Sequence, residues 1–329
     1  MEQTKHETAR QIALKLTLKV PRISKATLSA VAKVLILLHR EPPSSFFFLA
    51  NRLNHRVHTL ARLGNGMPIK VVWNDRVGLE IIQSGFHDAD NVQVLAQFMK
   101  PGMIFFDVGA HIGQYTLVAS QAGGPTGRIH SFEPDPESFV VLKHNLRIND
   151  LNNVKANQTA LFSKKDNRKF FISWPEFMGG NSLWCESGEW PGRVFDVSCD
   201  TLDDYVCSQG VSRIDVMKVD VEGGEVDLLL GAKTALGGEI KPAILIEFNG
   251  PALVRAGHTC SELAELLQDL GYSLFHISNS QFYPALKPPA DNTTTDCLAL
   301  PKTDSYSNWR ISGSAKGKST EASPTGESS

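Results

Sequence analysis

The sequence predicts an α/β protein built on a mostly parallel, seven-stranded, Rossmann-like sheet with helices on both faces. Short apolar runs alternate with stretches of helical period, which is typical of βαβ units. The clearest unit runs from Met103 to Pro134 and consists of an apolar strand, a glycine turn, a helix and a second apolar strand. Such a crossover joins parallel strands and places their carboxyl ends at one edge, where open α/β sheets bind ligands.

The residues at the ends of these two strands predict a nucleoside cofactor. Asp107 follows the first strand and Glu133 ends the second. A carboxylate in the second position can accept hydrogen bonds from both hydroxyls of a ribose. The turn has glycines at positions 109 and 113, a GxxxG spacing that lacks the GxGxxG spacing for a pyrophosphate. We therefore expect S-adenosylmethionine, with Asp107 helping to hold its ammonium group.

Six residues of this unit are candidates for contact with the cofactor. They lie at the strand ends, in the glycine turn and in the helix behind it. They are Asp107, Gly109, His111, Gly113, Tyr115 and Glu133.

Five successive motifs resemble those of a known family. They are DVGAHIGQYT, FEPDP, TLDDY, MKVDVEGGE and LIEF, and they lie between Phe105 and Tyr272. Together they resemble the FkbM-type S-adenosylmethionine-dependent methyltransferases, which usually have Asn where this chain has His111. The resemblance implies a class I methyltransferase fold and methyl transfer to a hydroxyl oxygen of a sugar, glycan or polyketide-like small molecule. It also implies that Gln158, Thr159 or Ala160 reaches the adenine, and Thr159 is the candidate we carry forward.

The chain before the first core strand is expected to hold an extension over residues 1–65. Its first forty residues carry eight basic residues against two acidic ones. The apolar run from Ala30 to Leu38 is interrupted by Lys33 and is too short to span a bilayer, so we expect no translocation. Two interpretations stay open. This basic helical extension either contacts an anionic membrane or a carrier protein, or it only caps the catalytic domain.

The catalytic domain is expected over residues 66–311. We predict a helix over 46–63 that ends just before this domain. Within the domain, before its first core strand, we predict a β-hairpin with arms at 69–73 and 77–81 and a helix over 91–99. The hairpin is expected to cover the cofactor pocket. Beyond Ile311 no apolar side chain is larger than alanine, so residues 312–329 are expected to be disordered.

Further elements follow Glu133. Asp135 is interpreted as a helix N-cap, and the third strand is predicted from Val154 to Leu161. RKFFIS and RVFDVS read as strands around an aromatic-rich insertion, which either binds the acceptor or packs as an ordinary hairpin. The aromatic residues concerned are Trp174, Phe177, Trp184 and Trp190. Later predictions are helix caps at Thr201 and Thr259, core strands ending near Val219 and Ile246, and edge strands over 274–277 and 297–300.

Methyl transfer is an in-line displacement, so the protein has to align an acceptor oxygen and take up its proton. We expect Asp220, after strand four, to be the general base or the acceptor anchor. Glu222 and Glu247 are the other catalytic candidates, and His111 is a helper. As an alternative, Asp220, Glu247 and Asn249 hold a divalent cation. Our principal prediction contains no metal.

Composition narrows the function further. A net charge of -2 gives no sign of nucleic-acid binding. Five cysteines without CxxC spacing indicate reduced thiols, as in a cytoplasmic protein. Two alternatives to a methyltransferase stay open, namely a nicotinamide-dependent oxidoreductase and a non-catalytic nucleoside-binding module.

Overall fold

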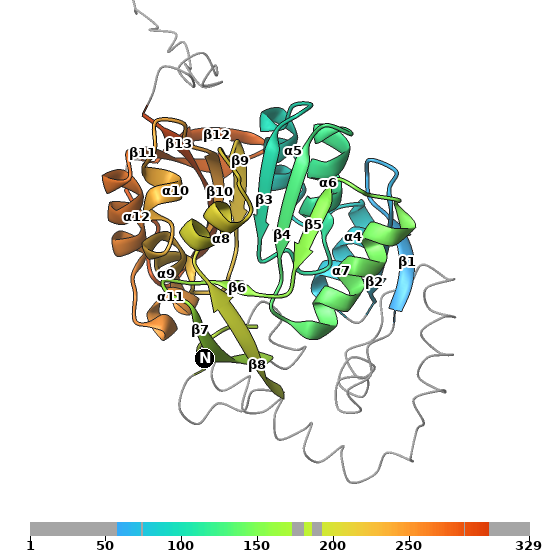
Figure 1. Cartoon of the computed structure of the whole chain (residues 1–329), viewed down its shortest axis with the longest axis horizontal. Helices are drawn as coiled ribbons and strands as arrows, with labels where there is room; N and C mark the ends of the chain where they lie inside the picture. The colour runs from blue at the N-terminus through green and yellow to red at the C-terminus, as the bar shows by residue number, and fades with distance from the viewer. Residues whose placement is uncertain (1–57, 74, 173–180, 186–192, 286, 303–329) are drawn as a thin grey trace, which may run out of the picture.

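The computed structural model of the chain describes residues 58–73, 75–172, 181–185, 193–285 and 287–302. In these residues an eight-stranded sheet forms the centre, in the order β12-β11-β13-β10-β9-β3-β4-β5 (Figure 1). Its strands are β3 (Ile104–Val108), β4 (Arg128–Phe132), β5 (Val154–Asn157), β9 (Val216–Val219), β10 (Ala243–Asn249), β11 (Tyr272–Ser278), β12 (Gln281–Pro284) and β13 (Thr294–Pro301).

The pairing pattern confirms the mostly parallel, Rossmann-like sheet. Strands β5, β4, β3, β9 and β10 are parallel neighbours, whereas β13 is antiparallel to both β10 and β11. The predicted count of seven is one too low, because β12 adds an antiparallel strand beside β11 at the edge. The predicted edge strands 274–277 and 297–300 lie in β11 and β13, which pair directly in the sheet. In the chain, β12 lies between them.

Helices cover both faces of this sheet. One face carries α4 (Arg76–Ser84), α5 (Ala89–Phe98), α6 (Gln114–Gly123) and α7 (Pro136–Ile148). The other carries α8 (Leu202–Ser208), α9 (Glu225–Leu230), α10 (Lys233–Gly237), α11 (Gly250–Ala256) and α12 (Cys260–Asp269). Side chains of β3 alternate between the two cores, since Phe105 packs in the first and Phe106 in the second. A strand buried on both faces explains the uninterrupted apolar run in the sequence.

The segment before the first core strand corrects two predictions. Residues 58–62 form strand β1 (His58–Arg62), antiparallel to β2 (Pro68–Val72), so the described end of the predicted helix over 46–63 is wrong. The domain boundary at residue 65 passes through this pair of strands. The second hairpin arm is also wrong, because it lies in helix α4. Asp75 caps that helix by accepting a 2.9 Å hydrogen bond from the Val77 amide, and Gly85 ends it in the left-handed conformation.

The predicted third strand is divided between two sheets. Its first part is β5, and its second part, β6 (Ala160–Leu161), joins a separate three-stranded sheet in the order β6-β8-β7. Strands β7 (Asp166–Ile172) and β8 (Arg193–Asp200) pair antiparallel, as RKFFIS and RVFDVS predicted. This small sheet extends from the carboxyl edge of the main sheet (Figure 1).

The predicted helix caps are confirmed. The Asp135 carboxylate accepts a hydrogen bond from the Glu137 amide at 3.0 Å, and Thr201 and Thr259 cap α8 and α12 in the same way. The Glu262 carboxylate, in the first turn of α12, lies 3.0 Å from the His258 ring.

Several sequence predictions fall outside the described residues. They concern most of the basic extension, the tail over 312–329, and three aromatic residues of the insertion, Trp174, Phe177 and Trp190. Trp184 is described, and its ring packs near Phe162 and Gly224. In the described part of the chain, no helix has the length and apolar character needed to cross a membrane. The five cysteines all lie in described segments and form no disulfide.

Asn145 of α7 links the outer strand β2 to the glycine turn. Its buried side chain accepts a hydrogen bond from the Lys70 amide at 2.6 Å and donates to the Lys70 carbonyl at 3.0 Å. It also donates to the Ile112 carbonyl at 2.8 Å. One amide group thus pairs with β2 as a neighbouring strand would and holds the turn at the same time.

We predict that Asn145→Ala lowers the free energy of unfolding by about 3 kcal/mol, because three backbone groups lose their partner, the buried Ile112 carbonyl and the half-buried amide and carbonyl of Lys70. Urea unfolding followed by circular dichroism measures the change. Asn152→Ala is the control, since Asn152 is exposed and donates only to the nearby Asp150 carbonyl. A loss for Asn145→Ala no larger than that of the control would show that the link contributes little.

Candidate active site

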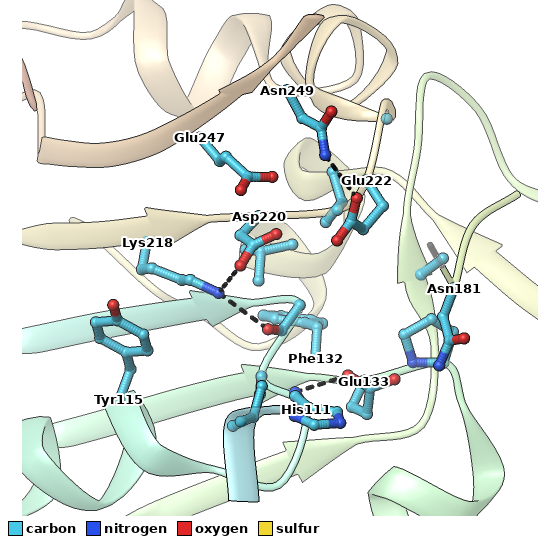
Figure 2. A pocket seen from close by; sticks show the side chains of 18 of the residues that line it. His111, Tyr115, Phe132, Glu133, Asn181, Lys218, Asp220, Glu222, Glu247 and Asn249 are labelled. Carbon is cyan, nitrogen blue, oxygen red and sulfur yellow. Dashed lines mark hydrogen bonds and ion pairs between the residues drawn. The ribbon is translucent and has the colours of Figure 1, made fainter. Parts of the chain in front are cut away.

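A cavity of about 750 Å³ lies where β3, β4, β9 and β10 end, which is a volume typical of small-molecule sites. It faces the carboxyl edge of the main sheet and is bordered by the small sheet (Figure 2). Eight of the ten candidate residues line it. They are Gly109, His111, Tyr115, Glu133, Thr159, Asp220, Glu222 and Glu247.

The glycine turn draws three strand ends together. The amides of Gly109 and Ala110 both donate to the Phe132 carbonyl, at 3.0 and 2.9 Å. Gly109 has φ +78, and a Cβ atom there would lie 1.8 Å from the Asp220 carbonyl oxygen. Only glycine therefore allows the turn after β3 to touch the end of β9.

The other two candidates, Asp107 and Gly113, are not among the residues that line the cavity. Asp107 is fully buried beneath the turn, and its Oδ2 accepts a 2.5 Å hydrogen bond from the Thr116 hydroxyl. Burial raises the pKa of its carboxyl group. Gly113 has φ +93 and begins α6, where a Cβ atom would lie 2.5 Å from Leu142. Both residues shape the turn from behind.

Glu133 lies at the opposite side of the cavity from the other acids (Figure 2). Its two carboxylate oxygens accept hydrogen bonds from the backbone amides of His111, at 2.7 Å, and Asp135, at 2.8 Å. Burial, together with the Asp135 charge, raises the pKa of Glu133 to about 8 despite these two bonds. Each oxygen keeps a second lone pair, so the fixed carboxylate can still accept from two neighbouring hydroxyls.

The remaining predicted cofactor residues frame the same wall. His111 adopts the left-handed conformation, with φ +49, and its ring lies 3.8 Å from the Asp75 carboxylate. Tyr115 presents a buried ring from α6. Thr159 lies between β5 and β6, where its hydroxyl donates to the Ser198 carbonyl at 2.8 Å. Thr159 therefore holds the small sheet against the cavity as well as lining it.

The three catalytic candidates are brought together. Carboxylate oxygens of Asp220, Glu222 and Glu247 lie within 4.8 Å of one another. Glu222 accepts a 2.9 Å hydrogen bond from the Asn249 amide group. Oε2 of Glu247 is buried and has no hydrogen-bond partner among the described residues.

The alternative cation set is only partly supported by this geometry. Asn249 uses its nitrogen on Glu222 and its oxygen to cap α11, through a 3.2 Å bond from the Ala252 amide. It is therefore engaged as a support, and Glu222 takes its place beside Asp220 and Glu247 in the cluster.

The close packing of these acids raises the pKa values of two of them. Burial and the neighbouring Asp220 and Glu222 charges raise the pKa of Glu247 to about 11. Burial, with Asp220 and Glu225, likewise raises the pKa of Glu222. Glu247 therefore holds a proton at neutral pH and can donate a hydrogen bond. Asp220 instead accepts a 3.0 Å bond from the Lys218 ammonium, which stabilises its anionic form.

The turn after β9 aims Glu222 into the cavity. Glu222 has φ +54 and Gly223 has φ +100, an uncommon backbone path for a glutamate. Buried Glu225 holds this path by accepting 3.1 Å bonds from the Val221 and Gly223 amides. Ser182, from the described part of the insertion, donates to the Glu222 carbonyl at 2.7 Å.

Sequence reasoning missed Lys218, Asp296, His87 and Asp88, which also line the cavity. Lys218 carried a usable signal, because a lysine inside the buried strand VMKV has to find a partner. His87 and Asp88 had none, since they follow a segment whose helix was not predicted.

Comparison with known proteins gives a family match over the region that builds this cavity. The sequence profile described as Methyltransferase FkbM domain matches residues 107–274, about half of the chain. Among solved structures, the methyltransferase FkbM from Methylobacillus flagellatus KT superposes with a TM-score of 0.38 and 16% identity, over 69% of this chain and 61% of that one.

Three curated proteins are similar in sequence. Methyltransferase sdnD from Sordaria araneosa is 29% identical over 196 residues, covering 51% of this chain and 73% of the relative. The 31-O-demethyl-FK506 methyltransferase FkbM from Streptomyces tacrolimicus is 26% identical over 163 residues, 42% of this chain and 62% of the relative. The 2-O-methyltransferase NoeI from Sinorhizobium fredii (strain NBRC 101917 / NGR234) is 26% identical over 158 residues, 44% and 63% respectively. The chain thus spans less than two thirds of the last two.

We predict that Gly109→Ala lowers the free energy of unfolding by about 3 kcal/mol or more, as left-handed strain and overpacking add together. The clash with Asp220 distinguishes this site from Gly257, which has φ +89 but no atom within 4 Å of a Cβ. Gly257→Ala, the matched control, should lose only about 1 to 2 kcal/mol. Chemical denaturation of both variants measures the difference, and equal losses would mean that the close approach is not restrictive.

Proposed function

Because the chain belongs to the FkbM methyltransferase domain family, we propose that it transfers a methyl group from S-adenosylmethionine to a hydroxyl oxygen of a sugar, glycan or polyketide-like small molecule. The chain is an S-adenosylmethionine-dependent methyltransferase of class I fold. The cluster of Asp220, Glu222 and Glu247 on the cavity wall carries the proposal of O-methylation. The printed names of two relatives, a 31-O-demethyl-FK506 methyltransferase and a 2-O-methyltransferase, agree with it.

The residues of the cavity fit this cofactor. S-adenosylmethionine supplies a methyl group already activated on a sulfonium. The fixed Glu133 carboxylate suits the two ribose hydroxyls, and the Gly109 turn allows close approach of the ligand. The acid-rich opposite wall suits the positive charges of the ammonium and sulfonium groups. Thr159 is the proposed neighbour of the adenine.

The acids then divide the work on the acceptor. Asp220 would take the proton of the acceptor hydroxyl, and the acceptor oxygen would receive the methyl group that S-adenosylmethionine supplies. Glu247, protonated at neutral pH, donates a hydrogen bond, and Glu222 lies beside it, so the two side chains orient other hydroxyl groups of the acceptor. Acidic side chains of this kind form hydrogen bonds with hydroxyl groups, so we propose an uncharged, hydroxyl-rich acceptor.

Family membership favours methyl transfer over the two alternatives, a nicotinamide-dependent oxidoreductase and a binding module without activity. For the compartment, we propose the cytoplasm, on the basis of cysteine usage alone. Contact of the basic N-terminal residues with an anionic membrane or a carrier protein is a further proposal, supported only by their charge.

We predict that the affinity for S-adenosylhomocysteine rises between pH 6 and pH 8.5. Glu133 has a pKa of about 8 and has to lose its proton to accept from both ribose hydroxyls, so binding releases a proton below that pH. Glu133→Gln should weaken binding about ten- to a hundredfold and remove this dependence. Calorimetry at three pH values measures both. Glu137→Gln, which alters a nearby carboxylate paired with Arg193, is the control. Persistence of the pH dependence in Glu133→Gln would exclude the ribose contact.

The function itself is tested with labelled S-adenosylmethionine and a panel of hydroxylated sugars, glycans and polyketide-like alcohols. We predict methylation of a hydroxyl and a loss of about a hundredfold or more in turnover for Asp220→Asn, with S-adenosylhomocysteine affinity within about threefold of the wild type. Glu247→Gln replaces an already protonated acid and should lose less than about tenfold. Transfer to nitrogen or carbon acceptors only would refute O-methylation.

A further inference from the structure

Lys218 occupies the centre of the site and belongs to none of the roles assigned above. It projects from β9, and its side chain is 7% exposed. Its ammonium donates to the Gly109 carbonyl at 3.1 Å and to Asp220 Oδ2 at 3.0 Å. Figure 2 shows the bond from Lys218 to Asp220, with the Tyr115 ring on the other side of Lys218. The nitrogen lies 5.1 Å from the centre of that ring.

These contacts join two parts of the site that have different tasks. Gly109 belongs to the turn that receives the cofactor, and Asp220 is the proposed base. The register of β3 and β9 pairs Asp107 with Lys218, so the buried Asp107 carboxylate lies close behind the same ammonium. A single cation therefore faces the turn, the base and the acid beneath the turn.

The surroundings of Lys218 are strongly acidic. Burial alone would lower its pKa, but the charges of Asp220 and Asp107 outweigh burial and raise it. Carboxyl groups from several elements act on Lys218 or on its partner Asp220, namely Asp88, Asp107, Glu133, Asp220, Glu222, Glu225, Glu247 and Asp296. Two further groups complete the set. The Arg255 charge lowers the pKa of Glu222. Burial, with the charges of Asp88, Asp296 and Asp220, raises the pKa of the Tyr115 hydroxyl.

We propose that Lys218 is the positioning residue of this active site, whose ammonium holds the cofactor turn and the Asp220 carboxylate together against the mutual repulsion of the surrounding acids. The inference rests on the proposed function only in treating Asp220 as the base. It assigns Lys218 no contact with the reacting atoms.

The proposal has a consequence that a space-filling lysine would not have. Without the ammonium, the pKa values of the surrounding acids rise further, so the folded state keeps protons that the unfolded state releases and loses stability as the pH rises. In the wild type, the raised pKa keeps Lys218 charged across the neutral range, so its contribution is present throughout. The deficit caused by removing Lys218 should therefore grow with pH.

The test compares the full-length wild type with Lys218→Met, Lys218→Arg and Lys241→Met. Melting temperatures are measured at pH 5.5, 7 and 8.5, and S-adenosylhomocysteine affinity is measured by calorimetry at pH 7.5. Lys241 is the matched control, because it is also partly buried and donates to a carbonyl, that of Leu270, but does not line the cavity.

For Lys218→Met we expect a melting deficit that at least about doubles from pH 5.5 to 8.5, and affinity weaker by about tenfold or more. Lys218→Arg, which keeps the charge, should recover at least half of both losses. Lys241→Met should show a deficit that does not vary with pH. A constant deficit for Lys218→Met, or an arginine variant no better than methionine, would reduce Lys218 to a packing role and overturn the proposal.

If Lys218→Met does not fold, Asp107→Asn/Lys218→Met is compared with Asp107→Asn, since the double variant also lacks the acid beneath the turn. The same pH-dependent deficit is expected, because Asp220, Glu222 and Glu247 still face one another, and its absence would overturn the proposal. None of these measurements uses an acceptor. Failure of the acceptor panel therefore refutes O-methylation without touching Lys218, and a flat pH response refutes Lys218 without touching O-methylation.

Discussion

The parallel pairing of β3 with β4 on one side and β9 on the other is the constraint on which the cavity depends. Its register sets Asp107 beside Ser131 in β4 and beside Lys218 in β9. The three strands consequently end together, and the glycine turn can bond to Phe132 while touching the Asp220 carbonyl. A shift of one residue in either pairing would turn these side chains to the other face and separate the turn from the acids.

Because the strand ends converge, several buried carboxyl groups lie close together. Their mutual repulsion is reduced in three ways, which differ from acid to acid. Glu133 and Glu225 accept hydrogen bonds from backbone amides, Asp220 accepts one from the Lys218 ammonium, and Glu247 keeps its proton at neutral pH. The backbone and side-chain groups that reduce this repulsion also set the protonation of each acid. The acids of the site therefore include groups that can accept a proton and groups that can donate one. A cofactor that carries positive charge adds to this balance.

The errors in sequence prediction have specific physical causes. Val77, Leu79 and Ile81 alternate as in a strand, but the Asp75 cap, the Arg76–Glu80 pair and Gly85 together stabilise a helix. Short apolar runs fit both periods, and here packing against β2 decides, because helix residue Gly78 lies so close that a Cβ would come within 1.9 Å of the Val72 carbonyl.

Asp107 illustrates what the sequence leaves open. Its place at a strand end is readable from the sequence, but its depth is not, and the turn that follows it folds over its carboxylate. Glu133, which also ends a strand, lines the cavity, because the backbone amides of His111 and Asp135 hold its carboxylate at the wall.

The βαβ unit of β3, α6 and β4, the glycine turn, the helix caps and the acids at strand ends were determined by the sequence alone, because each depends on residues close together in the chain. The tertiary structure alone decided which of these groups meet. Lys218 and Gly109 are 109 residues apart in the chain, and Glu222 reaches Asn249 across 27 residues. Distances of this kind, and the burial that sets the pKa of each acid, arise only when separate strands pack into one sheet edge.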